Sequence, residues 1–427
     1  MEPLSSSNET IAKPSHLNWI TGYGWMLAVS FVLAQPFHHL FELPILLMAL
    51  LGLWLLLSHT RNVWAMPAVK PLLIVFACIW LPMLFSLTDA VNLSRSAQTT
   101  LVFLRYPLAG IFLIYALQDA ISRKRLLRTT GVAISLGVLV MVILAITGHA
   151  YEGRVMGIPF PIAQLLGALS PILFFWVLSE AQRKRWMWLI LPLASSAMLF
   201  SGSRSSWIMF AVAFFLFLAQ LLFLEKSILN WKSGLVALLL LGIGVSFAIH
   251  APTMKERIAQ TAGLFSGNYA KANAATSLRL PIWTVAVHVA KDHWINGVGP
   301  RGFRYIYSQY VPKDDYWIAQ TMTDKSGKVI HPGLGPNHPH QFLLEVAAET
   351  GVIGLLGYLI ALIYWGRLAI QAIHKKTYDA LAWMAAAFVA VMPINAHMAL
   401  YASFWSCLVW WLVATALAYW QAGQRST

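Results

Sequence analysis

Long apolar runs separated by short polar turns occupy nearly the whole chain. A membrane-spanning helix needs roughly 20 apolar residues to cross a hydrocarbon core about 30 Å thick. Runs of this kind lie near residues 18–37, 40–58, 71–88, 99–118, 130–148, 158–179, 186–201, 206–224, 233–250, 341–366, 379–398 and 399–420. The pattern therefore predicts an all-α polytopic membrane protein with about 12 transmembrane helices.

One long polar interval interrupts this pattern and divides the chain into three parts. We expect helices 1–9 within residues 1–250, a large outer segment at 251–340, and helices 10–12 within 341–427. Lysine and arginine in short loops mark the cytoplasmic side. One set of alternate loops carries Arg61, Lys70, Arg123, Lys124, Arg125, Arg128, Arg183, Lys184, Arg185, Lys226, Lys232, Arg367, Lys375 and Lys376. The opposite short loops carry only Arg95, Arg154 and Arg204, so both termini are predicted to be cytoplasmic and 251–340 to lie outside.

Composition agrees with a membrane protein, because hydrophobic residues make up 59% of the chain and charged residues 11%. The net charge of +14 does not indicate nucleic-acid binding, since much of it belongs to the loops that set topology. The outer interval nevertheless carries more cations than anions, which favours an anionic ligand at that face. Both cysteines, Cys78 and Cys407, fall within apolar runs, so neither a disulfide framework nor a cysteine metal site is expected.

Three arginines are candidates for binding that anion. Arg204 lies in the polar turn Ser201–Ser206, whose small residues let a ligand approach, although a plain interfacial anchor is the alternative. Arg279 lies at the start of a helix that Ser277 is expected to cap, and a helix N-terminus with an arginine favours phosphate. A surface arginine on an interfacial helix is the other interpretation. Arg105 lies within an apolar run, so we expect it to face the bundle interior or a cavity, as a structural residue or part of a ligand path.

The string from Gly297 to Gly302 matches the G-x-G-x-x-G pattern of dinucleotide-binding folds. That pattern requires a preceding strand in a βαβ unit, and here a predicted helix precedes it. We therefore expect a tight turn rather than a nucleotide site. Arg301 and Arg304 extend from this turn and are candidates for lining an anionic groove.

Histidines cluster where the outer segment ends, at His331, His338 and His340. The two-residue spacing of the last pair does not place both on one helical face, and no carboxylate or cysteine stands at ligand spacing. A metal site is therefore not expected. Neutral histidine is a suitable general base near pH 7, and a polar surface position without function is the alternative.

Three stretches of the chain resemble the O-antigen ligase and polymerase superfamily of bacterial envelope glycosyltransferases. They are Ser201-Gly202-Ser203-Arg204-Ser205-Ser206-Trp207, the loop from Arg279 to Gly299-Pro300-Arg301-Gly302-Phe303, and His338-Pro339-His340-Gln341-Phe342-Leu343 with Glu349-Thr350-Gly351-Val352-Ile353-Gly354. The chain departs from the family at Gln341, where asparagine is frequent, and at Phe160-Pro161-Ile162, where an asparagine-proline-asparagine turn is frequent.

The resemblance implies transfer of a polysaccharide from undecaprenyl pyrophosphate to a sugar hydroxyl of lipid A-core. The reaction would take place at the periplasmic face of the bacterial inner membrane, within a membrane-lipid environment, with inversion and without metal or other cofactor. His338 is the expected base, with His340 as the second choice. Arg204 and Arg279 are expected to bind the pyrophosphate, followed by Arg301. Secondary candidates are Arg105, Arg154 and Arg304.

Two other functions stay open. Within the same superfamily, the chain could be an O-antigen polymerase or a protein-directed oligosaccharide transferase. Outside it, a secondary transporter of an anionic solute is the alternative. A carrier would be expected to show internal repeats and a site near the middle of the membrane. The sequence shows neither a strong repeat nor such a placement of its candidate residues.

Overall fold

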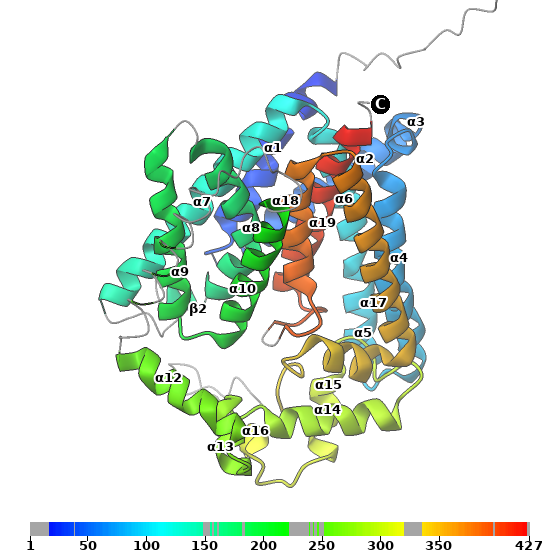
Figure 1. The fold of residues 1–427 in the computed structure, drawn as a ribbon. Coiled ribbons are helices and arrows are strands. Elements are labelled where there is room, and N and C mark those ends of the chain that lie inside the picture. Colours follow the sequence, from blue (N-terminus) through cyan, green and yellow to red (C-terminus); the bar gives the residue numbers. More distant parts are fainter. Residues whose placement is uncertain are drawn as a thin grey trace, which may run out of the picture.

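The computed structural model describes residues 17–37, 39–147, 154–155, 158–159, 162–181, 184–221, 239, 242, 246, 252–319, 335–395 and 398–424. Helices form nearly all of the regular structure in this part of the chain (Figure 1). The described strands are β1 (Arg154–Val155) and β2 (Ile158–Pro159), which pair antiparallel. The prediction of an all-α fold is therefore confirmed.

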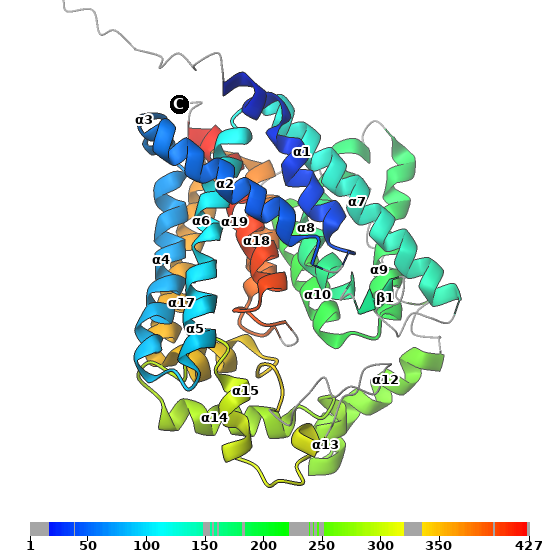
Figure 2. The same cartoon turned by 180° about the vertical axis from the view of Figure 1, so that it is seen from behind.

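Most of the helices stand side by side in one bundle (Figures 1 and 2). They are α1 (Asn18–Ala34), α2 (Glu42–Ser58), α3 (Thr60–Trp64), α4 (Val69–Phe85), α5 (Leu93–Phe103), α6 (Arg105–Ala116), α7 (Ala120–Ile146), α8 (Ile162–Ala181), α9 (Ile190–Phe200), α10 (Arg204–Ala219), α17 (Phe342–His374), α18 (Tyr378–Val391) and α19 (Ser403–Gln424). Short 3-10 turns extend α4 and precede α9, at η2 (Ser86–Asp89) and η4 (Arg185–Leu189).

Within the described residues, six helical stretches are long and apolar enough to cross a membrane. These are Val69–Asp89, Leu93–Ala116, Ala120–Leu144, Ile162–Glu180, Phe342–His374 and Ser403–Gln424. Shorter apolar helices lie at Glu42–Ser58, Arg185–Phe200, Arg204–Ala219 and Tyr378–Val391. The run predicted at 233–250 falls almost wholly outside the described residues, so the count of about 12 spans stays a prediction, as do the domain boundaries.

The bundle is apolar both inside and on its outward faces. Its centre is aromatic, and the side chains of Trp383, Trp405 and Trp411 are fully buried there. Large apolar side chains also point outward, among them Leu57 at 73% exposed, and Phe215 at 68%. Helices that are apolar all round suit a lipid environment rather than water.

A second group of shorter helices covers one end of the bundle, opposite the end where α3 and the C-terminus lie (Figures 1 and 2). It comprises α12 (Pro252–Ala262), η6 (Gly263–Phe265), α13 (Tyr269–Ala275), α14 (Leu280–Asp292), α15 (Phe303–Ile306), η7 (Tyr307–Gln309) and α16 (Tyr316–Ala319). A small core of its own includes Ile282, Val289, Phe303 and Tyr307, and Ala348 of α17 joins it. The outer segment therefore packs directly on α17, while its periplasmic location stays a prediction.

The helix expected near Arg279 is present as α14, but the cap predicted for it is wrong. Arg279 itself occupies the N-cap position, and no side chain caps the helix. Ser277 and Leu278 adopt positive φ angles of 58° and 61° as the chain reverses after α13. In that conformation the backbone of Ser277 continues the preceding turn, with its N–H donating to the carbonyl of Ala274.

α17 bends at Gly351, where φ of 63° and ψ of −160° are not helical. A break in a helix leaves backbone N–H and C=O groups without their usual partners, and such groups are costly when buried. The turn that follows α14 supplies those partners. Its four hydrogen bonds join Val352 to Trp294, Ile353 to Ile295, Val298 to Ala348 and Gly299 to Glu349, at 2.8, 3.2, 3.0 and 3.0 Å.

The other side of this turn is bound to the start of α5. The carbonyl of Val298 accepts the N–H of Val91 at 3.1 Å, and the Ser96 hydroxyl donates to the carbonyl of Pro300 at 3.1 Å. Gly299 has a φ of 88°, and a Cβ on it would lie 2.5 Å from the Ser96 hydroxyl. The glycines of this string therefore serve a tight turn, as predicted, and a helix rather than a strand precedes them.

We expect Gly351→Ala to destabilise the protein. Its Cβ would lie 2.3 Å from the carbonyl oxygen of Ile295, and the backbone conformation is one that only glycine adopts readily. Strain and overpacking together should cost roughly 2–4 kcal/mol. Thermal unfolding of the purified protein in detergent should show a lower Tm. Gly366→Ala in the same helix is the control, because nothing lies within 4 Å of its added Cβ. Equal Tm values for the two variants would contradict this role of the bend.

Candidate active site

Arg204 begins α10, directly after the serine-rich turn. The backbone of Ser203, at the N-cap, is extended with φ −86° and ψ 101°. Its hydroxyl accepts hydrogen bonds from the hydroxyl of Ser206 at 2.8 Å and from Nε2 of Gln164 at 3.0 Å. The polar side chains thus bind this turn to α8, and they fix the position from which Arg204 extends.

Arg279 and Arg204 lie close enough to influence each other electrostatically. Burial, and after it the charge of Arg204, lowers the pKa of Arg279 to about 10. Arg279 therefore stays charged at neutral pH, in an environment that disfavours its charge. Each arginine stands at the start of a helix, where the dipole already favours anions. The fold has brought together the two arginines that the sequence selected for an anion.

His338 and His340 lie in the turn that leads into α17, outside any helix. Their ring centroids are 4.0 Å apart, with an angle of 46° between the rings. The backbone N–H of His340 donates to Nδ1 of His338 at 3.1 Å, and His340 has a positive φ of 57°. A spacing that would separate the two rings on a helix brings them together in this turn.

The start of α17 is anchored to the segment that follows α18. Gln341 caps α17, because its Oε1 accepts the N–H of Leu344 at 2.7 Å. Its Nε2 donates to the carbonyl of Pro393 at 2.8 Å, and the N–H of Phe342 donates to the carbonyl of Asn395 at 3.2 Å. The histidine pair is therefore held by two parts of the chain that are distant in sequence.

Two buried carboxylates in α17 have structural contacts that the sequence analysis did not assign. Glu345 accepts the N–H groups of Leu400 and Tyr401 at 2.8 and 3.2 Å. Glu349 accepts the N–H of Arg301 at 2.6 Å. Two acids one turn apart in an apolar run were a signal for such a role, since a charged group in a membrane span is costly without partners.

Arg301 and Arg304 lie at the opposite end of α14 from Arg279. Arg279 is the N-cap of this helix and His293 its C-cap. At 1.5 Å per residue, these positions are about 20 Å apart along the helix. Arg301 lies in the turn after α14 and Arg304 in α15, and the charges that act on Arg304 are those of Arg301 and Arg95 rather than of Arg279 or Arg204. The fold does not group Arg301 with the pair expected to bind pyrophosphate.

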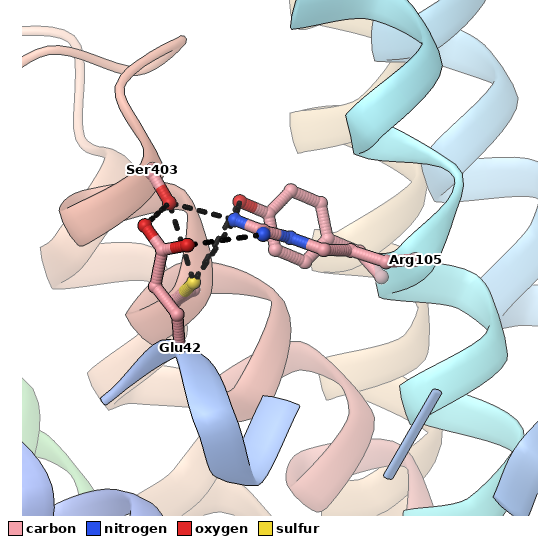
Figure 3. A network of polar contacts seen from close by, with 5 residues as sticks. Glu42, Arg105 and Ser403 are labelled. Carbon is pink, nitrogen blue, oxygen red and sulfur yellow. Dashed lines mark hydrogen bonds and ion pairs between the residues drawn. The ribbon is translucent and has the colours of Figure 1, made fainter. Parts of the chain in front are cut away.

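Arg105 lies inside the bundle in a polar network rather than on the covered end (Figure 3). Its guanidinium forms an ion pair with Glu42 of α2 at 3.5 Å and donates to the hydroxyl of Ser403 at 2.6 Å. Ser403 in turn donates to Glu42 at 2.6 Å, while Tyr106 and Cys407 complete the cluster. Arg105 thus connects the starts of α2, α6 and α19, which supports its structural interpretation.

Arg154 and His331 complete the set of candidates from the sequence. The backbone of Arg154 belongs to β1, and its side chain lies outside what the structure describes, as does the whole of His331. Among the His, Cys, Asp and Glu side chains that are described, no group of three is placed to hold a metal ion.

We expect the Arg105 network to show a large coupling energy. Glu42→Gln leaves a cation whose side chain is only 16% exposed without its carboxylate, which should cost about 1–3 kcal/mol. Arg105→Gln leaves Glu42, 35% exposed and still bonded to Ser403, and should cost less. The double variant should recover part of the loss relative to the sum of the single variants. Thermal unfolding of all four proteins in detergent measures this, and additive changes in Tm would contradict it.

Comparison with known proteins identifies the region that contains most of these residues. The sequence profile of the O-Antigen ligase family matches residues 188–359. The match includes the two arginines at the helix starts, the histidine pair, Arg301 and Arg304, and it excludes Arg105 and Arg154. No curated protein sequence matches the chain. Residues 188–359 therefore carry a domain of the O-Antigen ligase family, whose members are glycosyltransferase-like enzymes of O-antigen processing, and the apolar helices indicate a multi-pass membrane protein.

Proposed function

We propose that the protein is an O-antigen ligase, which transfers a polysaccharide from undecaprenyl pyrophosphate to a sugar hydroxyl of lipid A-core. The observation that carries the proposal is the approach of Arg204 and Arg279, from two separate helix starts, on the covered end of the bundle. This end would face the periplasm of a bacterial inner membrane, with both termini in the cytoplasm.

The two arginines suit the leaving group of this reaction. When the anomeric bond breaks, negative charge builds up on the pyrophosphate. Guanidinium groups bind phosphate oxygens through paired N–H donors and stabilise that charge more strongly in the transition state than in the ground state. Burial and then the charge of Arg204 lower the pKa of Arg279, and a bound pyrophosphate would offset the second of these effects. In this mechanism the arginines do the work for which other transferases employ a metal ion.

The histidine pair suits activation of the acceptor. A neutral imidazole carries one N–H and one lone-pair nitrogen. Because Nδ1 of His338 accepts the N–H of His340, we place the ring proton of His338 on Nε2 in this proposal. His338 then presents a donor, and a base needs a lone pair. We therefore assign the base to His340 and give His338 the role of holding it and orienting the hydroxyl, reversing the order expected from the sequence.

The reaction is a single displacement. The acceptor hydroxyl oxygen forms a bond to the anomeric carbon while the bond from that carbon to the pyrophosphate oxygen breaks. The hydroxyl proton passes to the histidine, and undecaprenyl pyrophosphate leaves with the electron pair, bound by Arg204 and Arg279. Attack opposite the leaving group inverts the configuration at the anomeric carbon.

We expect His340→Ala to lower kcat by roughly 10²- to 10⁴-fold, the usual loss when a general base is removed. His338→Ala should lower kcat less. His338→Asn should retain more activity than His338→Ala, because an amide oxygen can still accept the His340 N–H. The measurement is the formation of capped lipid A-core on a gel, from purified protein, lipid-linked polysaccharide and lipid A-core with EDTA present.

Exposed His288 of α14 provides the matched control, and His288→Ala should leave kcat unchanged. A greater loss in His338→Ala than in His340→Ala would return the base to His338. Full turnover in both variants would rule out the histidine pair. Lengthening of polymer on the undecaprenyl carrier would indicate a polymerase instead. Absence of any transfer with matched donors, together with anion flux in proteoliposomes, would indicate a transporter.

We expect Arg204→Gln and Arg279→Gln each to lower kcat/KM for the lipid-linked donor by roughly 10²- to 10³-fold. Lysine at either position should restore only part of the lost kcat/KM, because a single ammonium lacks the paired donors of a guanidinium. Inorganic pyrophosphate should compete with the donor in the unmodified protein and less in the variants. Lys291→Gln, an exposed cation of α14, is the control for loss of one positive charge. Unchanged donor kinetics in both glutamine variants would exclude this site.

A further inference from the structure

Three arginines gather at the end of α14 that lies away from the proposed donor site. Arg95 belongs to the first turn of α5, Arg301 to the turn after α14 and Arg304 to α15. The hydroxyl of Ser96 donates to the carbonyl of Pro300 at 3.1 Å, which ties the segments of Arg95 and Arg301 together. Backbone contacts therefore hold a cluster of like charges in place.

Two of these guanidinium groups have buried nitrogen atoms that lack a hydrogen-bond partner among the described residues. These atoms are Nη1 of Arg301 and Nε of Arg304. A buried cationic N–H without an acceptor costs free energy, which an anion bound there would recover. The atoms thus indicate where an acceptor belongs.

Two buried carboxylates of α17, Glu345 and Glu349, lie within electrostatic reach of Arg301 and compensate the cluster only in part. Glu349 directs Oε2 to the backbone N–H of Arg301 rather than to a guanidinium. Within the described chain, no ion pair joins any of the three arginines to an acid. Burial lowers the pKa of Arg304, Tyr305 opposes this, and the charges of Arg301 and Arg95 lower the pKa again. Three arginines thus stand against two carboxylates, which leaves the cluster an excess of positive charge.

The cluster is electrostatically distinct from the donor arginines, because Arg279 is influenced by Arg204, and Arg304 by Arg301 and Arg95. α14 lies across the end of the bundle, with its first residues near α13 and its last below α5 and α17 (Figures 1 and 2). Its two caps are about 20 Å apart by helical rise. Each end of α14 thus has its own group of arginines.

We propose that Arg95, Arg301 and Arg304 form a second anion site, which binds a phosphomonoester group of the acceptor glycolipid. The inference rests on the proposed ligase function. A phosphate offers several oxygens to guanidinium forks, and binding it at this end of α14 would hold the acceptor while the donor occupies the other end. Free phosphate and a phospholipid headgroup share this chemistry, and the experiment separates them from the acceptor.

The test compares two acceptors, lipid A-core as isolated and the same material after a phosphatase has removed its phosphomonoesters. With the full-length protein in neutral detergent, dephosphorylation should lower kcat/KM for the acceptor roughly 10- to 100-fold. Arg301→Gln and Arg304→Gln should each show a similar loss with the phosphorylated acceptor and no further loss on dephosphorylation. KM for the donor should not change. Lys313→Gln, an exposed cation of the same outer segment, should behave like the unmodified protein.

A binding measurement keeps this inference separate from the ligase proposal. Inorganic phosphate should raise the Tm of the protein above that in chloride of equal ionic strength, and Arg301→Gln and Arg304→Gln should each reduce the rise. A reduced rise in the variants without any transfer by the unmodified protein would support the anion site and reject the ligase. If the variants reduce the rise in Tm but transfer is equally fast with and without acceptor phosphate, the site binds free phosphate or a headgroup. That result would overturn the proposal. Transfer that depends neither on acceptor phosphate nor on Arg301 and Arg304, with an unchanged rise in Tm in the variants, would overturn it as well.

Discussion

The bend of α17 at Gly351 is the constraint on which the covered end of the bundle depends. A helix that breaks inside an apolar environment leaves N–H and C=O groups that must find partners. The turn at residues 294–299 provides hydrogen-bond partners for four of these groups. The two backbones can approach this closely only because glycines lie at the contact. The bend and the turn each require the other. Neither would be stable alone, because each would leave buried polar groups unsatisfied.

This mutual dependence determines where the charged groups of the outer segment lie. With its C-terminal end fixed to α17 and α5, α14 acts as a rigid spacer across the bundle. Its N-terminal end brings Arg279 to Arg204, and its C-terminal end holds Arg301 near Arg95. A helix keeps its length, so the separation of the two cationic groups does not depend on side-chain adjustment. In the proposed reaction, this arrangement would let two phosphate-bearing substrates bind with reduced repulsion between their charges.

The sequence predicted the helices of the bundle well, because the length and apolarity of a run are local properties. It also predicted α14 and the glycine turn, while the anion-binding role of Arg204 and Arg279 stays a prediction. The bend of α17 was not foreseen, since Gly351 adopts its conformation only against a turn more than fifty residues earlier in the chain. For the same reason the ion pair of Arg105 with Glu42 and the separate location of Arg301 required the fold. Pairings between distant segments carry no periodic signal in one sequence.

Backbone strain gives independent support to the positions selected for function. Outside glycine, the described residues with positive φ include Ser277 and Leu278, which precede Arg279, and also Arg301 and His340. Each costs about 1–2 kcal/mol in an L-residue and persists only where the surrounding contacts determine it. These four lie at the ends of the elements that present the arginines and the histidine pair, while His39 and Lys376, which also have positive φ, lie elsewhere. Such turns fix the positions of charged groups in the free protein, and in the proposed reaction this would reduce the reorganisation needed when the glycosidic bond breaks.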